Sequence, residues 1–140
     1  MEPFFEGQCF AFDVTPTIDD IDRFAALSGD HNPLHMSAAF ARARGFADRV
    51  VHGALLGSYV SRMAGMYCPG TDALLHSMSI QFKQPAYPGN ALRVHAEVDQ
   101  VSWGTNTIVL KITIVSLADG AVHATGKVQV GLTQPAPTPP

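Results

Sequence analysis

The stretch "VVHGALLGSYVSRMAGMY", residues 50–67, predicts a helix that begins near Gly53 and ends near Met66. Small and apolar residues occupy nearly every side of this helix, so we expect it to be buried inside the protein. His52, Arg62 and three glycines interrupt the stretch, which is also shorter than the roughly 20 apolar residues that span a bilayer. The segment therefore indicates a central core helix, and we expect a soluble protein with no membrane partner.

The residues after this helix predict strands. Four segments, 74–84, 91–102, 105–117 and 121–132, alternate apolar and polar residues or are rich in β-branched ones. Short turn-forming sequences, "PAYPGN", "WG" and "ADG", separate them. Together they predict an antiparallel meander long enough to curl around the buried helix.

The residues before the central helix predict two further helices. "TPTIDDIDRFAALSGD", residues 15–30, has Thr17 as N-cap, Asp20 at the capping-box position and a stop at Gly29. Ser37 can cap a short helix that ends at Gly45. Helices followed by strands indicate the α+β class. A curved antiparallel sheet around one helix is the hotdog architecture, which we expect as a single domain over residues 1–132, with a proline-rich disordered tail over 133–140.

Composition excludes several classes of protein. Of 140 residues, 46% are hydrophobic and 15% charged, which is typical of one globular domain. The formal net charge is −3 and the nine basic residues are scattered, so nucleic acid is not an expected partner. Two cysteines do not form a disulfide framework, and the first ten residues lack the pattern of a signal peptide. We expect a cytoplasmic protein.

The segment "GDHNPLH", residues 29–35, carries the candidate chemistry. Asp30 and His35 are a possible acid and base pair, and the Asn32-Pro33 turn between them directs both side chains toward one point. Asp30, His31 and His35 are also metal-ligand types, with the two histidines four residues apart. Pro33 argues against a continuous helix that would align them, so we expect neither a metal nor a cofactor.

The segments "FAALSGDHNPLHMSAAFA" (24–41) and "VVHGALLGS" (50–58) resemble the MaoC-like (R)-specific enoyl-CoA hydratase and dehydratase family. The resemblance extends from Phe10 to about Leu132. It implies reversible syn addition of water to a trans-2-enoyl-CoA, which gives an (R)-3-hydroxyacyl-CoA. It also implies that Asp30 and His35 are the catalytic pair, with the roles of base and acid left open.

The start of the central helix supplies the third predicted element. Unpaired N–H groups and the positive end of the helix dipole suit the oxygen of a reacting thioester. The resemblance implies that the backbone N–H of Gly53 is the oxyanion donor, and that His52 orients the start of the helix, unless it is a simple packing residue.

A stripe of small residues on the same helix has two interpretations. Gly53, Gly57, Ser61 and Gly65 recur every four residues, with Ala64 beside the last of them. Gly57, Ser61 and Ala64 are candidates for an acyl-chain groove; equally, the stripe lets a strand pack closely.

Three other functions remain open at this point. The substrate could be carried by an acyl carrier protein and dehydrated, or a hotdog protein could be a thioesterase or a non-catalytic binder of acyl thioesters. The resemblance further implies a homodimer with active sites near the interface. The loop "QPAYPGN" (84–90), stiffened by Pro85 and Pro88, is our candidate for the wall that one subunit gives to its partner's site. Lys83 or Arg93 could contact the phosphates of coenzyme A, although ordinary surface charge is the better explanation for both.

Overall fold

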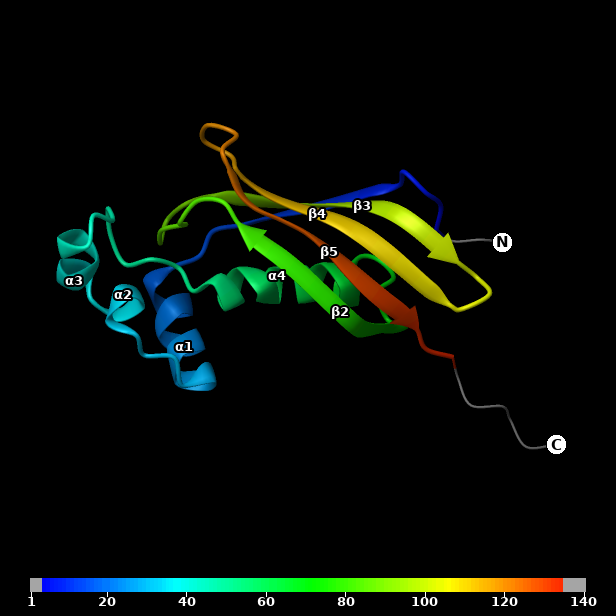
Figure 1. Ribbon diagram of the computed structural model, residues 1–140, viewed down its shortest axis with the longest axis horizontal. Helices are drawn as coiled ribbons and strands as arrows, with labels where there is room; N and C mark the ends of the chain where they lie inside the picture. Colours follow the sequence, from blue (N-terminus) through cyan, green and yellow to red (C-terminus); the bar gives the residue numbers. More distant parts are fainter. Residues whose placement is uncertain (1–3, 135–140) are drawn as a thin grey trace.

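The computed structural model describes residues 4–134 and shows one curved antiparallel sheet that covers a central helix, α4 (Gly53–Met66) (Figure 1). The five strands are β1 (Cys9–Val14), β2 (Ala73–Phe82), β3 (Leu92–Ser102), β4 (Thr107–Ser116) and β5 (Val122–Leu132), in the order β1-β3-β4-β5-β2. The predicted α+β hotdog class is confirmed.

The predicted meander of four strands is wrong in two respects. The first is β1, which the sequence analysis did not include and which pairs with β3 from Cys9↔Glu97 to Val14↔Leu92. The second is β2, which pairs with β5 rather than β3. Residues 83–91 carry the chain from one edge strand across to β3, so the meander consists of β3, β4 and β5 alone.

The N-terminal helices follow their local signals. Helix α1 (Ile18–Ser28) has the predicted capping box between Thr17 and Asp20. It ends at Gly29, whose φ of 80° is left-handed, a conformation that glycine adopts without strain. A one-turn helix, α2 (Pro33–Met36), precedes α3 (Ala38–Ala43), which Ser37 caps as predicted. These three helices gather at one end of the sheet, beyond the start of α4 (Figure 1).

The core lies between α4 and the inner face of the sheet. Alternate residues of β3, β4 and β5 point inward and are buried, whereas residues between them, such as Arg93, Lys111 and Lys127, are exposed. Helix α4 is buried along the side that faces the sheet. The prediction that it is buried on nearly every side is wrong, because the side away from the sheet exposes Ala54, Ser58, Ser61, Arg62, Gly65 and Met66. The buried cluster includes Leu56, Val60 and Met63 of the helix and Leu92, Val94, Leu110, Ile114, Val128 and Val130 of the strands.

The described helices and the C-terminal residues were the subject of two further predictions, on membrane spans and on a disordered tail. In the part of the chain that the structure describes, no helix is both long enough and apolar enough to cross a membrane. Residues 135–140 of the predicted disordered tail lie outside the described residues.

We expect Gly126→Ala to lower the free energy of unfolding by about 1–3 kcal/mol, because a Cβ atom there overpacks a site bounded by backbone. Gly126 lies in β5 opposite Ile80, and an added Cβ would be 2.2 Å from the carbonyl oxygen of Ser79. Gly65 in α4 is the matched control, since a Cβ there meets nothing within 4 Å. Gly65→Ala should raise stability by roughly 0.5–1 kcal/mol. Urea unfolding measures both, and equal effects would contradict the close approach of β2 and β5.

Candidate active site

The local turn predicted between the two helices brings the candidate acid and base together. Asp30 follows the end of α1, and its Oδ1 accepts a hydrogen bond from the Asn32 N–H (3.2 Å). Asn32 in turn caps α2, since its Oδ1 accepts from the Leu34 N–H (2.9 Å), and Pro33 occupies the first position of that helix. His35 therefore lies on the single turn of α2, directly beside the Asp30 loop.

The catalytic pair predicted from the sequence is brought together in space. His35 Nε2 lies 3.9 Å from Asp30 Oδ2, with the histidine side chain 14% and the aspartate side chain 50% exposed. His35 Nδ1 donates to the carbonyl oxygen of Val50 (2.7 Å). This bond leaves Nε2 of a neutral ring as the acceptor that faces the carboxylate. Two acceptors at this separation can contact the same small molecule.

His52 is buried next to Asp30 and His35 and contacts both residues. Its ring stacks on His35, with 3.9 Å between ring centroids and an interplanar angle of 24°. Its Nε2–H donates to the backbone carbonyl of Asp30 (3.0 Å). Burial lowers the pKa of His52 below its ordinary value, so the ring is neutral at pH 7. A neutral, buried ring of this kind fixes the positions of its two neighbours.

The start of α4 opens into the same pocket as His35. Gly53 is the first residue of the helix, and among the described residues its N–H has no hydrogen-bond partner, as helix geometry dictates for the first turn. The pocket has a volume of about 310 Å³ and a mainly apolar lining. It is lined by His35, Val50, Val51, Gly53, Leu56, Phe82, Lys83, Gln84, Pro85 and Ala86.

The two candidate phosphate contacts are placed differently. Lys83 lies on the pocket, next to the predicted loop of residues 84–90. Arg93 does not line it; its guanidinium pairs instead with Asp13 of β1 through bonds of 2.8 and 3.1 Å. This pairing raises the pKa of Arg93 and lowers that of Asp13. The arginine is therefore engaged by the neighbouring strand and does not face the pocket beside His35.

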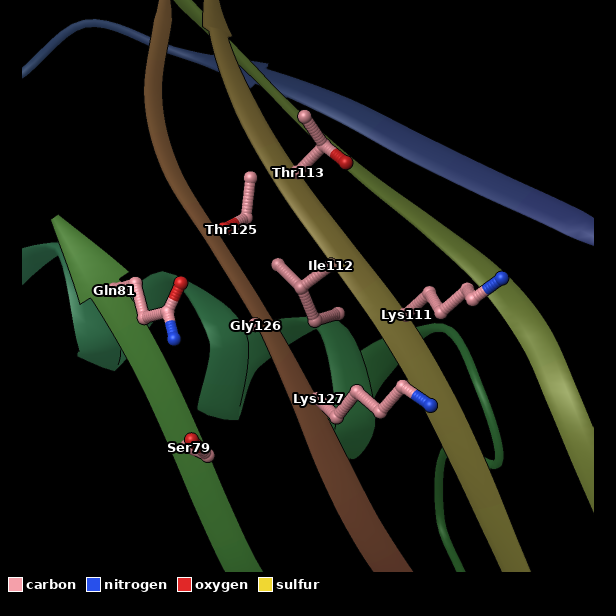
Figure 2. Close-up of a pocket in the computed structure, with 8 residues that line it drawn as sticks. All are labelled: Ser79, Gln81, Lys111, Ile112, Thr113, Thr125, Gly126 and Lys127. Atoms are coloured by element: carbon pink, nitrogen blue, oxygen red, sulfur yellow. The ribbon is translucent and has the colours of Figure 1, made fainter. Parts of the chain in front are cut away.

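A second hollow, of about 450 Å³, lies on β2, β4 and β5 (Figure 2). It contains none of the predicted site residues. Its polar lining includes Lys111 and Lys127, and both lysines form ion pairs with Asp99. It offers neither an acid and base pair nor a free helix start, so the chemistry points to the pocket beside His35.

The only metal-type cluster within the described residues consists of Asp30, His35 and His52, rather than the Asp30, His31 and His35 considered from the sequence. His31 is exposed. One nitrogen of each ring is engaged by a backbone carbonyl oxygen, that of Val50 for His35 and that of Asp30 for His52. The expectation that the site holds no metal stays a prediction.

The stripe of small residues on α4 meets strand β2. A Cβ at Gly57 would lie 3.6 Å from Ile80 Cδ1 and 3.9 Å from Met78 Cε, so the strand packs closely at this point. Ser61 is exposed and Ala64 is buried, and neither lines the pocket beside His35. Both distances are those of ordinary van der Waals contact, so an alanine would fit at position 57, and close packing and the acyl-chain groove both stay predictions.

Sequence reasoning missed several residues of the site. Val50 contributes its backbone carbonyl oxygen, which bonds to His35. Every residue has such an oxygen, so the identity of the side chain does not indicate that this one belongs to the site. Phe82 lines the pocket, and its ring lies 2.9 Å from the position of a Cβ at Gly53. Its alternation with Ile80 and Met78 along β2 is the signal that would have placed it on the helix side.

Comparisons with known proteins agree with the fold. The family model described as "MaoC like domain" matches residues 6–119. The chain is 34% identical over 113 residues to the (R)-specific enoyl-CoA hydratase of Aeromonas caviae, which covers 81% of this chain and 84% of that protein. It is 33% identical over 82 residues to the 3-hydroxybutyryl-CoA dehydratase of Methylorubrum extorquens, covering 59% of this chain and about half (52%) of that relative. The solved structure of the (R)-hydratase from A. caviae involved in PHA biosynthesis superposes with a TM-score of 0.88 at 31% identity, covering 94% of this chain and 99% of that one.

Proposed function

The chain belongs to the MaoC-like domain family, and on this premise we propose that it is a hydro-lyase that adds water reversibly to a trans-2-enoyl-CoA. The product is the (R)-3-hydroxyacyl-CoA, with the configuration taken from the similarity to (R)-specific hydratases. The observation that carries this proposal is the Asp30 and His35 pair beside the free N–H of Gly53. Water addition of this kind needs no cofactor.

The pair suits the activation of one water molecule. Asp30 Oδ2 and His35 Nε2 are both acceptors and lie 3.9 Å apart, so a single water can donate one proton to each. As one O–H bond breaks, the water oxygen bonds to C3 of the thioester. The pair returns one proton to C2 from the same side, which makes the addition syn.

The start of α4 suits the charge that develops during this step. Attack at C3 moves the double-bond electrons toward the thioester oxygen, which becomes enolate-like until C2 is protonated. The Gly53 N–H and the positive end of the helix dipole stabilise that oxygen. His52 serves as a support for the pair, through its stacking on His35 and its bond to Asp30.

A second candidate function is dehydration of 3-hydroxyacyl thioesters, including those carried by an acyl carrier protein. The similarity to a 3-hydroxybutyryl-CoA dehydratase favours this direction, and one site catalyses both directions of a reversible reaction. A thioesterase or a non-catalytic binder would use the same fold without water addition at C3.

A spectrophotometric assay tests the proposal. Purified protein is mixed with crotonyl-CoA and with longer trans-2-enoyl-CoAs, and loss of the conjugated thioester absorbance is followed while a thiol reagent monitors free coenzyme A. We expect absorbance to fall without thiol release. Thiol release would identify a thioesterase, and no change with either free or carrier-bound thioesters would contradict the enzyme assignment.

We also propose a homodimer that pairs through the β2 edge. Apolar side chains lie exposed along this edge strand, including Leu74 (54%), Met78 (43%) and Phe82 (53%). Exposed, apolar edge strands favour pairing with another chain. The dimer would place a partner subunit next to the pocket, because Phe82 lies on both the edge and the pocket lining.

Light scattering should therefore give twice the chain mass of 15.0 kDa. A charge at the centre of the edge, Met78→Lys, should shift the protein toward the monomer and lower activity, whereas Ser77→Lys, on the other face of β2, should change neither. A fully active monomer would show that the interface is dispensable.

The acyl-chain groove is tested at Ser61, which is exposed on α4. We expect Ser61→Leu to lower kcat/KM for long enoyl chains by about tenfold or more while leaving the four-carbon substrate nearly unaffected, since added bulk fills the path of the tail. Equal losses for every chain length, or a fall in melting temperature alone, would favour the close-packing interpretation.

A further inference from the structure

Arg49 is held in an unusually enclosed position for an arginine, with its side chain 12% exposed. Its Nε donates to the backbone carbonyl oxygen of His35 (2.6 Å). Its Nη2 contacts Asp22 Oδ1 on helix α1 (2.5 Å) and lies 3.8 Å from the sulfur of Met36. One guanidinium thus joins α1 to the short helix that carries the catalytic histidine.

Helix α2 needs such a support because it is only four residues long. A single helical turn is not stable by its own hydrogen bonds and takes its position from its surroundings. The Val50 N–H bonds to the Leu34 carbonyl (3.1 Å) and secures one residue of the turn. The Arg49 bond to the His35 carbonyl secures the next residue of the turn.

The contacts of Arg49 indicate that its side chain does not touch the substrate. Its contacts are to a backbone oxygen, a carboxylate on another helix and a sulfur, and it does not line the pocket beside His35. Its rigid, planar group can satisfy His35 and Asp22 simultaneously, which a lysine ammonium at the end of a flexible stem does less well.

We propose that Arg49, braced by Asp22, is a positioning residue that holds the backbone of His35 so that Nε2 stays aligned with Asp30. This inference rests on the proposed hydration activity. Loss of the guanidinium leaves the substrate pocket in place but lets the α2 turn drift. A misplacement of about 1 Å in a catalytic group can lower the rate by about 10²-fold.

The test compares Arg49→Ala, Arg49→Lys and Asp22→Asn with the wild-type protein on crotonyl-CoA. We expect kcat to fall by about 10- to 100-fold in Arg49→Ala, less in the other two variants, with KM within about threefold of wild type. The matched control is Arg23→Ala, which removes an exposed ion pair with Asp19 on the same helix and should leave both constants unchanged.

Two further measurements separate positioning from a general loss of stability. Guanidinium ion at a non-denaturing concentration should restore part of the kcat of Arg49→Ala and have no such effect on Arg23→Ala. The ¹⁵N spectrum of the His35 ring should show a weakened Nδ1 bond to Val50 in the Arg49 variants below their melting temperatures. If Arg49→Ala does not fold, Arg49→Lys and Asp22→Asn are measured in the same way.

The inference would be overturned if Arg49→Lys and Asp22→Asn both fold and both have normal kcat. It would also be overturned if the variants differed from wild type only in KM. Wild-type protein that is inactive on every enoyl thioester would overturn the proposed function instead, so the two failures are distinguishable.

Discussion

Asp30→Asn and His35→Ala are each expected to lower kcat by a factor of about 10² to 10⁴ while the fold stays intact. The reason is that, in the proposed mechanism, Asp30 Oδ2 and His35 Nε2 act on the same water; the two atoms lie 3.9 Å apart. Either change removes one of the two groups that hold the water and exchange protons with it and with C2. The double variant should consequently be little worse than either single one, since groups that act as a unit are not additive.

Steady-state kinetics on crotonyl-CoA measures these changes, with thermal unfolding as a check on the fold. His31→Ala is the matched control, because His31 belongs to the same loop but is exposed. It should retain near-normal turnover. Near-normal turnover in Asp30→Asn or His35→Ala would refute the assignment, and multiplicative losses in the double variant would argue that the two residues act in separate steps.

The elements that the sequence predicted well are those with local causes. The Thr17 and Asp20 capping box and the left-handed Gly29 define α1 within a few residues of chain, and α4 begins at Gly53 and ends at Met66 as its apolar run predicts. Strand pairing depends on distant residues. The chain offers no local sign that β2 pairs with β5, some fifty residues later, or that β1 completes the opposite edge.

The same distinction applies to the site. The turn from Asp30 to His35 is a local motif, so the proximity of its two candidate side chains was predictable. The contacts that hold His35 come from residues 14 and 15 positions later: the Arg49 side chain and the Val50 carbonyl oxygen. The stacking of His52 on His35 likewise depends on how the start of α4 docks against α2, which is a tertiary arrangement.

The largest remaining effect is expected at the start of α4, where a proline can remove a single N–H. Proline is tolerated at the first position of a helix, because that N–H has no partner within the helix. His52, the residue before it, has φ −55° and ψ 133°, which is the extended conformation that a residue before proline requires. Gly53→Pro should therefore preserve the helix while it removes the proposed oxyanion donor.

Gly53→Ala supplies the matched comparison. Both variants add a Cβ atom that meets the ring of Phe82, 2.9 Å from that position, and this half-exposed ring can turn aside in either case. Only the proline variant lacks the N–H. Removal of one oxyanion donor typically lowers kcat by about 10²- to 10³-fold, so we expect Gly53→Pro to be slower than Gly53→Ala by about that factor, at similar melting temperature. Equal kcat in the two variants would show that the Gly53 N–H does not stabilise the thioester oxygen, and the charge would then have to be met by the helix dipole or by another donor of the pocket.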